Sequence, residues 1–261
     1  MAKWIGAWDC RMGRHDCATI GDVAHYCHST LSDGDVLWVT WRDAEDDVYR
    51  AFRLSGDGYS DSGFAWVDGS TWTTVYEGRT GERVKLTEVW ADDDTMNYTW
   101  HRSLRGEAWE ETGGGALTRV HDAASPVAAP EVARGEAPWD FMAGSWEFVG
   151  IDGGGECRLV GNAGFYCVTE GGGEEAIWVT WWDDGDEVYR TYRLYSDGYA
   201  DAGVVWIDGD SWTFVYEGKI GDRAKMVTAR TDDDRFEYMW HRSLRGGPWE
   251  QTTGFAMKRV R

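Results

Sequence analysis

Lysine, proline and long apolar segments are scarce in this sequence of 261 residues. No apolar run approaches the roughly 20 residues that a membrane-spanning helix needs, so we expect no transmembrane segment. The N-terminus shows no basic-then-apolar leader of the kind that directs secretion, because the first domain motif already begins at Trp4. We therefore expect a cytoplasmic protein.

Basic residues are also in short supply. The 46 Asp and Glu outnumber the 26 Lys and Arg, which gives a formal net charge of −20. Nucleic acids and anionic membrane surfaces attract proteins through Lys and Arg, so we expect neither as a partner. Acidity of this size also keeps soluble proteins apart from one another, and that effect alone accounts for the charge.

The common fingerprints of catalysis and metal binding are missing. The sequence has no Gly-x-Ser-x-Gly elbow, no Walker loop and no dinucleotide fingerprint. It has no CxxC or HxxxH spacing that would suggest a metal site. The acidic segments 57–61 and 196–201 lack the alternating oxygen ligands and distal Glu of a calcium loop, so we interpret them as turns. We expect no metal ion.

What the sequence does contain is one domain, present twice. The segment Tyr-Thr-Trp-His-Arg-Ser-Leu-Arg-Gly at 98–106 returns at 238–246 with a single substitution, a shift of 238 − 98 = 140 positions. From position 38 to 120, roughly half of the residues are identical to their partners at this shift. Stacked repeats run to about 20 to 50 residues, so a unit this long is a domain.

The repeat divides the chain into three parts. We predict a first domain over residues 1–120, a Pro/Ala-rich linker over 121–138 and a second domain over 139–261. The linker holds three of the four prolines, Pro126, Pro130 and Pro138, and proline favours extended spacers. A domain of about 120 residues can build its own core. Because the domains are copies, we expect that they can pack on each other as the subunits of a homodimer do.

Each domain consists of short segments in which the residues of the two strand faces alternate with a period of two. These segments are rich in aromatic and β-branched residues, and Gly or Asp separates one from the next, as at the Asp68-Gly69 hairpin signal. No helical pattern of useful length is present. Consecutive hairpin-linked strands leave open edges unless the sheet closes on itself. We predict an all-β protein made of two tandem antiparallel up-and-down barrels, with about eight to ten strands each.

Four of the five cysteines belong to the repeat, because Cys17 and Cys27 recur as Cys157 and Cys167, whereas Cys10 has no counterpart. Each pair brackets a Gly-centred turn that would place the two residues opposite each other, where a strained, reducible disulfide is one option. The other option is a pair of small buried thiols, and a reducing cytoplasm favours it. We expect thiols.

The repeated strand supplies the candidate ligand-binding residues. Tyr98, Trp100 and Arg102 share one face of it, and we expect this face to point inward together with Trp72 and Tyr76. The corresponding candidates in the second domain are Trp212, Tyr216, Tyr238, Trp240 and Arg242. A barrel of this size has room for side chains or for one small ligand. Such a lining suits a flat, partly anionic molecule, although aromatic packing and local Arg–acid pairs would explain the same residues.

His101 and His241 are the only histidines that the repeat duplicates. A histidine on a strand next to aromatic residues can be a general base, a haem ligand or an ordinary hydrogen-bonded surface group. We name both as candidate catalytic residues.

These features together resemble a family of bacterial calycin-like barrels of uncharacterised function, related in shape to lipocalins and nitrobindins. The resemblance covers nearly all of each domain. It rests on the openings Gly-Ala-Trp at 6–8 and Gly-Ser-Trp at 144–146, the strand pair that ends in Cys27 or Cys167, the Asp-Gly turn, and the Gly-x-x-Trp segments at 106–109 and 246–249. It implies one interior pocket per domain for an apolar or aromatic ligand. Nitrobindin-type relatives hold haem through a histidine, and His101 or His241 would be the counterparts.

The leading hypothesis is a small-molecule binding protein whose ligand is aromatic or apolar, with an anionic group as an option. The alternative is a cofactor-independent isomerase or cyclase in which His101, Tyr98 and Arg102, or their repeats, move protons or hold charge. A haem protein is the second alternative; otherwise we expect no cofactor. Because Thr74 is replaced by Phe214 in the second copy, we also predict that the second interior is the tighter one.

Overall fold

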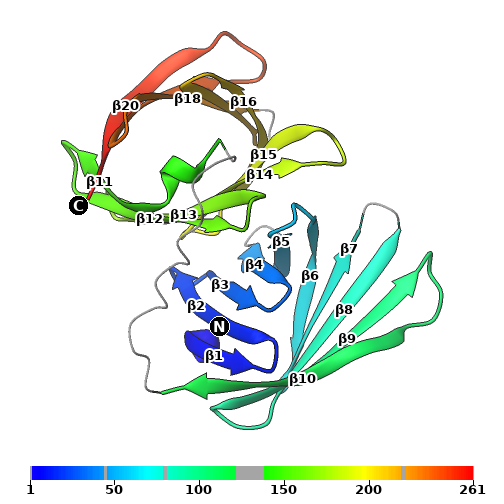
Figure 1. Ribbon diagram of the computed structural model, residues 1–261. Coiled ribbons are helices and arrows are strands. Elements are labelled where there is room, and N and C mark those ends of the chain that lie inside the picture. Colours follow the sequence, from blue (N-terminus) through cyan, green and yellow to red (C-terminus); the bar gives the residue numbers. More distant parts are fainter. Residues whose placement is uncertain (1, 44–45, 79–80, 122–137, 219–221, 261) are drawn as a thin grey trace. The chain divides into compact units, whose positions relative to one another are not determined.

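The computed structural model describes residues 2–43, 46–78, 81–121, 138–218 and 222–260. It divides into two compact units, Met1–Val132 and Ala133–Arg261. Each unit is a closed antiparallel barrel of ten strands (Figure 1), which confirms the prediction of an all-β protein with two tandem barrels. The predicted linker 121–138 lies outside the described residues except for its two end positions.

The first barrel is an up-and-down meander in which each strand pairs with the next and β1 closes on β10. A short 3-10 helix, η1 (Ala2–Trp4), precedes the strands. The strands are β1 (Gly6–Cys10), β2 (Gly13–Ile20), β3 (Ala24–Leu31), β4 (Gly34–Asp43), β5 (Val48–Ser55), β6 (Ser60–Asp68), β7 (Thr71–Glu77), β8 (Glu82–Trp90), β9 (Thr95–Leu104) and β10 (Glu110–Val120).

The second barrel repeats this meander, with β11 closing on β20. The 3-10 helix η2 (Asp140–Met142) precedes it. Its strands are β11 (Gly144–Val149), β12 (Gly153–Val160), β13 (Gly164–Gly171), β14 (Glu174–Asp183), β15 (Val188–Tyr195), β16 (Ala200–Asp208), β17 (Ser211–Glu217), β18 (Arg223–Asp232), β19 (Arg235–Ser243) and β20 (Glu250–Arg259).

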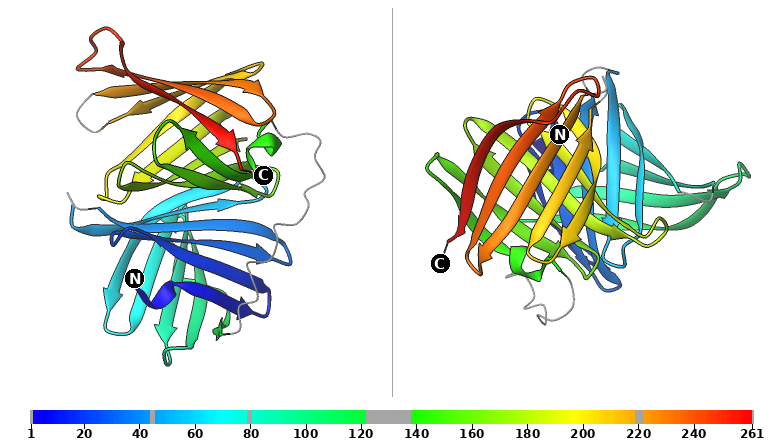
Figure 2. Two further views of the ribbon diagram at one scale, coloured as in Figure 1. Left: turned by 90° about the vertical axis from the view of Figure 1, so that its left-hand side faces the viewer. Right: turned by 90° about the horizontal axis from the view of Figure 1, so that it is seen from above.

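The turn chemistry of the sequence accounts for these hairpins. Gly69 and Gly209 follow Asp at the β6–β7 and β16–β17 turns, with φ values of 60° and 57°. A two-residue hairpin needs such left-handed conformations, and glycine adopts them without a steric penalty. The strands of each barrel cross its axis obliquely, as Figure 2 shows, which is the tilt that closing a sheet into a barrel requires.

Both repeated cysteine pairs are disulfides. Cys17 and Cys27 are direct cross-strand neighbours on β2 and β3, with their Cα atoms 4.1 Å apart, and Cys157 and Cys167 repeat the arrangement at 4.0 Å. The expectation of thiols was therefore wrong. A three-residue turn between β2 and β3 holds the two side chains opposite each other, and that geometry prevails over the argument from compartment. Cys10 is a free cysteine.

The 3-10 helices supply aromatic side chains that close one end of each barrel. In the first barrel Trp4 stacks on His25, with ring centres 5.5 Å apart, and meets Trp90 edge-on at 5.4 Å. In the second barrel Phe141 packs on Trp212 and Phe236 at 5.1 and 5.0 Å. The interior of each barrel therefore begins at an aromatic plug.

Within the described ranges, no helix has the length and apolar character needed to cross a membrane.

Candidate functional site

An arginine surrounded by aromatic rings lies inside the first barrel. The Arg53 guanidinium carbon is 5.0–5.6 Å from the centres of four rings, those of Trp38, Tyr59, Tyr76 and Trp100. Its Nε donates to Asp61 Oδ1 over 2.9 Å, and its Nη2 donates to the second carboxylate oxygen. Both oxygens of Asp61 are thus engaged in the two-point geometry that makes Arg–carboxylate pairs strong.

The second barrel builds the same arrangement around Arg193 and Asp201, with Nε to Oδ1 at 2.9 Å. Its four rings are those of Trp178, Tyr195, Tyr216 and Trp240. Burial by itself lowers the pKa of Arg193, but the hydrogen bonds and charge of Asp201 together with the nearby tyrosines outweigh it, and the pKa is raised. The arginine therefore stays charged, and the carboxylate of Asp201 balances that charge.

The sequence pointed to a different pair of arginines. Arg102 is half exposed and its Nε lies 2.6 Å from Glu82 Oε1, while Arg242 lies 2.8 Å from Asp222 Oδ2. Both are engaged with neighbouring acids. Sequence reasoning missed Arg53 as the guanidinium among the rings, although the alternation of 48–54 already separates Arg53 from the outer residues of β5.

The predicted aromatic residues do come together inside the barrels. In the first barrel, Trp72 and Tyr76 are buried, and Trp100 lies 5.8 Å from Trp38, which in turn meets Tyr76 at 6.2 Å. Tyr98 is partly buried against the core of the same barrel. In the second barrel the predicted set Trp212, Tyr216, Tyr238 and Trp240 lies in or against one buried cluster.

His101 and His241 occupy the other face of their strands. Strand alternation directs the side chain of each away from Trp100 or Trp240, and its cross-strand neighbours are Lys85 and Lys225, respectively. In each, the Nδ1 atom is buried and has no hydrogen-bond partner among the described residues. The two histidines therefore do not face the interior where the aromatic residues gather.

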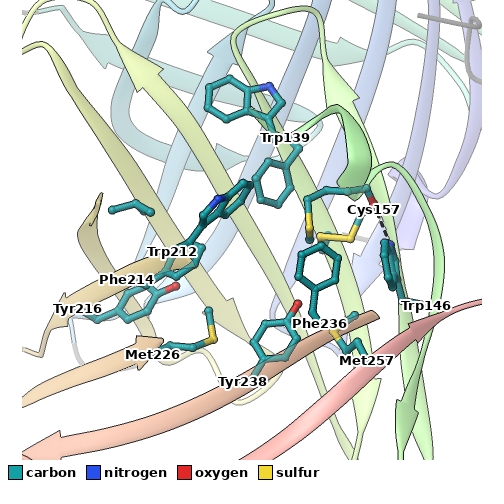
Figure 3. Packing of buried hydrophobic residues seen from close by; sticks show 14 residues of the cluster. Trp139, Trp146, Cys157, Trp212, Phe214, Tyr216, Met226, Phe236, Tyr238 and Met257 are labelled. Atoms are coloured by element: carbon teal, nitrogen blue, oxygen red, sulfur yellow. Dashed lines mark hydrogen bonds between the residues drawn. A yellow bond between two sulfur atoms is a disulfide. The ribbon is translucent and has the colours of Figure 1, made fainter. Parts of the chain in front are cut away.

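Large buried side chains gather inside the second barrel, as Figure 3 shows. Phe214 lies 6.2 Å from the Trp212 ring and is parallel to Tyr216 at 6.4 Å, and Phe165 meets Trp212 at 6.1 Å. The buried cluster consists of Trp139, Met142, Trp146, Cys157, Phe165, Cys167, Val205, Trp212, Phe214, Tyr216, Met226, Phe236, Tyr238 and Met257.

The first barrel has smaller or polar side chains at several of these positions. His25 stands where the second barrel has Phe165, and Thr74 stands where it has Phe214. The register shows a third exchange, because Glu88 is the cross-strand neighbour of Trp72 just as Thr228 is the neighbour of Trp212. The two barrels thus share the same strand framework but differ in the side chains that face their interiors.

Glu88 is a buried carboxyl in the first barrel, with 7% of the residue exposed. Its cross-strand neighbours Trp72 and Tyr98 face the interior, so the carboxyl points inward as well. Among the residues that the structure describes, no side chain or backbone group forms a hydrogen bond with it. Burial raises the pKa of Glu88 to about 8, so the protonated form, which carries an O–H donor, predominates at neutral pH.

His25 also lies against Trp72. Its ring meets Trp72 edge-on at 6.0 Å, and its buried Nδ1 has no hydrogen-bond partner in the part of the chain that the structure describes. Burial lowers the pKa of His25 to about 3, so the imidazole is neutral. The candidate site is therefore the indole of Trp72 with its cross-strand neighbour Glu88, a mostly protonated carboxyl, and the neutral imidazole of His25. Sequence reasoning missed both groups, because neither residue recurs in the second domain.

Comparisons with known proteins give little information about the function of this site. No family model and no curated protein matches the chain. Among solved structures, the chain is similar to a protein of unknown function from the DUF3598 family of Nostoc punctiforme PCC 73102, at 14% identity and a TM-score of 0.24, over 99% of this chain and 97% of that one. A similarity of this degree carries no argument about function.

Proposed function

We propose that the first barrel binds a small, flat, neutral molecule beside Trp72, between Glu88 and His25. The observation that carries the proposal is Glu88: a protonated carboxyl buried among aromatic rings without a partner, at a position where the second barrel has threonine. Ligand sites combine an apolar lining with a few polar groups that fix orientation, and perturbed pKa values gather at such sites.

The chemistry of the ligand follows from these groups. Glu88 donates a hydrogen bond, so the ligand needs an acceptor such as a carbonyl oxygen. The rings of Trp72 and Tyr76 favour a flat aromatic or conjugated body. Because the carboxylate of Asp61 already balances the charge of Arg53, an anionic group on the ligand would gain less from that cation than from an unpaired one. The proposal therefore favours a neutral ligand.

We also propose that both barrels are calycin-like. The up-and-down meander of ten strands and the aromatic plug at one end of each barrel support this assignment. The second barrel, with its interior filled by large side chains, then serves as a scaffold and the first as the binding module.

A cofactor-independent isomerase or cyclase is the second candidate. Glu88 favours it, because a neutral buried acid can protonate or hydrogen-bond a developing oxyanion. His25 opposes it, since a general base works best with a pKa near the working pH, and the pKa of His25 is about 3. A binding protein can use both Glu88 and His25 to form hydrogen bonds with its ligand. A proton-transfer mechanism has a role for Glu88 only.

Haem does not fit the residues that the resemblance would assign to it. His101 and His241 lie on the outer faces of β9 and β19, beside Lys85 and Lys225, so neither presents an imidazole to the interior of its barrel. We derive no role for haem from this arrangement.

Native mass spectrometry of the purified chain, followed by titration with the neutral fluorescent probe N-phenyl-1-naphthylamine, tests the proposal. We expect one saturable site per chain that is lost in Thr74→Phe, which introduces the ring of the second barrel, and kept in the outer-face control His101→Ala. Absence of saturable binding by wild type, or equal binding by Thr74→Phe, would overturn it.

A further inference from the structure

Four side chains form a hydrogen-bonded series on the inner face of β1 to β4. Cys10 Sγ lies 3.6 Å from His15 Nε2, and His15 Nδ1 lies 2.6 Å from Ser29 Oγ. Trp38 Nε1 donates to the same Ser29 oxygen over 2.9 Å. A nucleophile next to a base, with a third group that orients the base, is the arrangement by which proteins activate a nucleophile.

The second barrel lacks this series. At the positions of Cys10, His15 and Ser29 it has Phe148, Gly155 and Thr169. The indole nitrogen of Trp178, which corresponds to Trp38, is buried there and finds no hydrogen-bond partner within the described ranges. Because both barrels form the same ten-strand meander, the fold does not depend on the series.

The thiol faces the interior that holds the proposed ligand. Cys10 and Tyr98 pack against the same buried cluster of the first barrel. Tyr98 is in turn the cross-strand neighbour of Glu88, which is more than nine-tenths buried, points into this interior and has no hydrogen-bond partner in the part of the chain that the structure describes. A molecule held by Glu88 would share this interior with the sulfur atom.

We propose that Cys10 is a nucleophile, activated by His15 as general base, that adds to a conjugated carbonyl compound bound in the first barrel. The proposal rests on the proposed function, which supplies a flat ligand with a carbonyl acceptor. It goes further by giving that ligand a reactive double bond and the barrel a nucleophile that forms a covalent adduct with it.

The step is balanced within the ligand and the protein. His15 Nε2 takes the proton of the thiol while sulfur bonds to the β-carbon of the double bond. The π electrons move to the α-carbon and the carbonyl oxygen, where the Glu88 O–H is the donor that we propose. The proton then passes from His15 to the α-carbon, which leaves a thioether and neutral imidazole. No oxidant, reductant or further reactant takes part.

The charges around His15 are consistent with a base that works as neutral imidazole. Burial lowers the pKa of His15 to about 4, against the opposing charges of Asp16 and Asp9. Arg14 pairs with Asp16 at 3.1 Å, and Arg119 lies over the ring of Trp8, the cross-strand neighbour of His15. The imidazole is therefore unprotonated over the whole physiological range, and as a weak base it takes the thiol proton only while the carbon–sulfur bond forms.

The test is the rate of alkylation of the full chain by N-ethylmaleimide between pH 5 and 9, followed by intact-protein mass spectrometry. Wild type, His15→Asn, Ser29→Ala and Ser29→Thr are compared. In wild type we expect one adduct per chain, at a rate that changes little with pH. In His15→Asn the rate should rise about tenfold per pH unit, as it does for a thiol that must ionise unaided. At pH 6 N-ethylmaleimide should therefore alkylate wild type at least about tenfold faster than His15→Asn.

Ser29→Thr, which introduces the residue of the second barrel, should keep most of the wild-type rate, whereas Ser29→Ala should lose part of it. Coincident pH profiles for wild type and His15→Asn, or a native wild-type chain that does not react, would refute the activated thiol. Binding of N-phenyl-1-naphthylamine reports on the other proposal separately. If the probe fails to bind while the profiles differ as expected, the ligand site fails and the activated thiol stands.

Discussion

Glu88 in the first barrel and Thr228 in the second occupy the same position, each as the cross-strand neighbour of a buried tryptophan. The duplication therefore offers an internal comparison in which one framework holds an ionisable group and the other does not. Any property of the first barrel that depends on Glu88 should be missing from the second.

Stability should fall with rising pH because of Glu88. Its pKa in the folded protein is about 8, against an ordinary value of 4.5. Between these values the unfolded chain releases the proton and the folded chain keeps it. The carboxyl therefore lowers the free energy of unfolding by up to about 1.4 kcal/mol for each pH unit, and above pH 8 the effect is constant. Glu88→Gln should remove this dependence and be more stable than wild type at pH 8.

Urea unfolding at pH 5, 6.5 and 8 measures the difference between wild type and Glu88→Gln, with the exposed Glu110→Gln as control. A difference that does not grow from pH 5 to pH 8 would show that Glu88 is ionised in the folded protein, and the assignment of a hydrogen-bond donor would fail with it.

Removing one member of the pair Arg193–Asp201 should lower the free energy of unfolding much more than replacing both members with apolar residues. Its side chains are 6% and 2% exposed. Asp201→Ala leaves a buried guanidinium without its carboxylate among four aromatic rings, and we expect a loss of about 3–5 kcal/mol in the free energy of unfolding. The double variant Arg193→Met/Asp201→Leu removes both charges and should lose much less. If Asp201→Ala unfolds at the urea concentration of wild type, the pair contributes nothing to stability.

The sequence was sufficient for the fold, because strand alternation and Gly or Asp turns are local signals. Alternation separates Tyr98 and Trp100 from His101 along one strand, but it does not say which face of that strand points inward, so the inward aromatic face was only the favoured expectation. The pairing of Arg53 with Asp61 depends on the register between β5 and β6. That register becomes visible only once both strand ends are known.

Glu88 was harder to predict for a different reason. It lies in a strand that also carries Glu82, Arg83 and Lys85, and such a segment reads as a solvent-exposed edge. Only closure of the barrel turns every second residue of β8 inward, and the duplicated sequence draws attention to what the copies share rather than to where they differ. His25 and His15 were overlooked in the same way.

The disulfides predict a simple thiol count. Of the five cysteines, Cys10 is the free one, so denatured but unreduced protein should react with one equivalent of Ellman's reagent and reduced protein with five. Five equivalents without reductant would mean that the pairs are thiols in solution.

Loops of 10 residues suggest that Cys157→Ser lowers the free energy of unfolding by about 2–3 kcal/mol. Trapping thiols in intact cells would also test the expected cytoplasmic location, where disulfides are rare.

Exchanging Thr74 and Phe214 tests whether the first barrel has room inside. Phe214 packs between Trp212 and Tyr216, so Phe214→Thr should leave a void and lower the free energy of unfolding by about 3 kcal/mol. Thr74→Phe adds a ring to the first barrel. It also removes the hydroxyl that accepts a hydrogen bond from Trp72 Nε1 at 3.1 Å, which should lower the free energy of unfolding by about 1 kcal/mol. Thr74→Val measures the cost of losing this hydrogen bond alone. Relative to Thr74→Val, the added ring should cost less than about 1 kcal/mol if the interior holds space for a ligand, and about 1–3 kcal/mol if it is already packed. Urea unfolding of the three variants decides between these outcomes, and the higher cost would leave the proposed ligand without a place to bind.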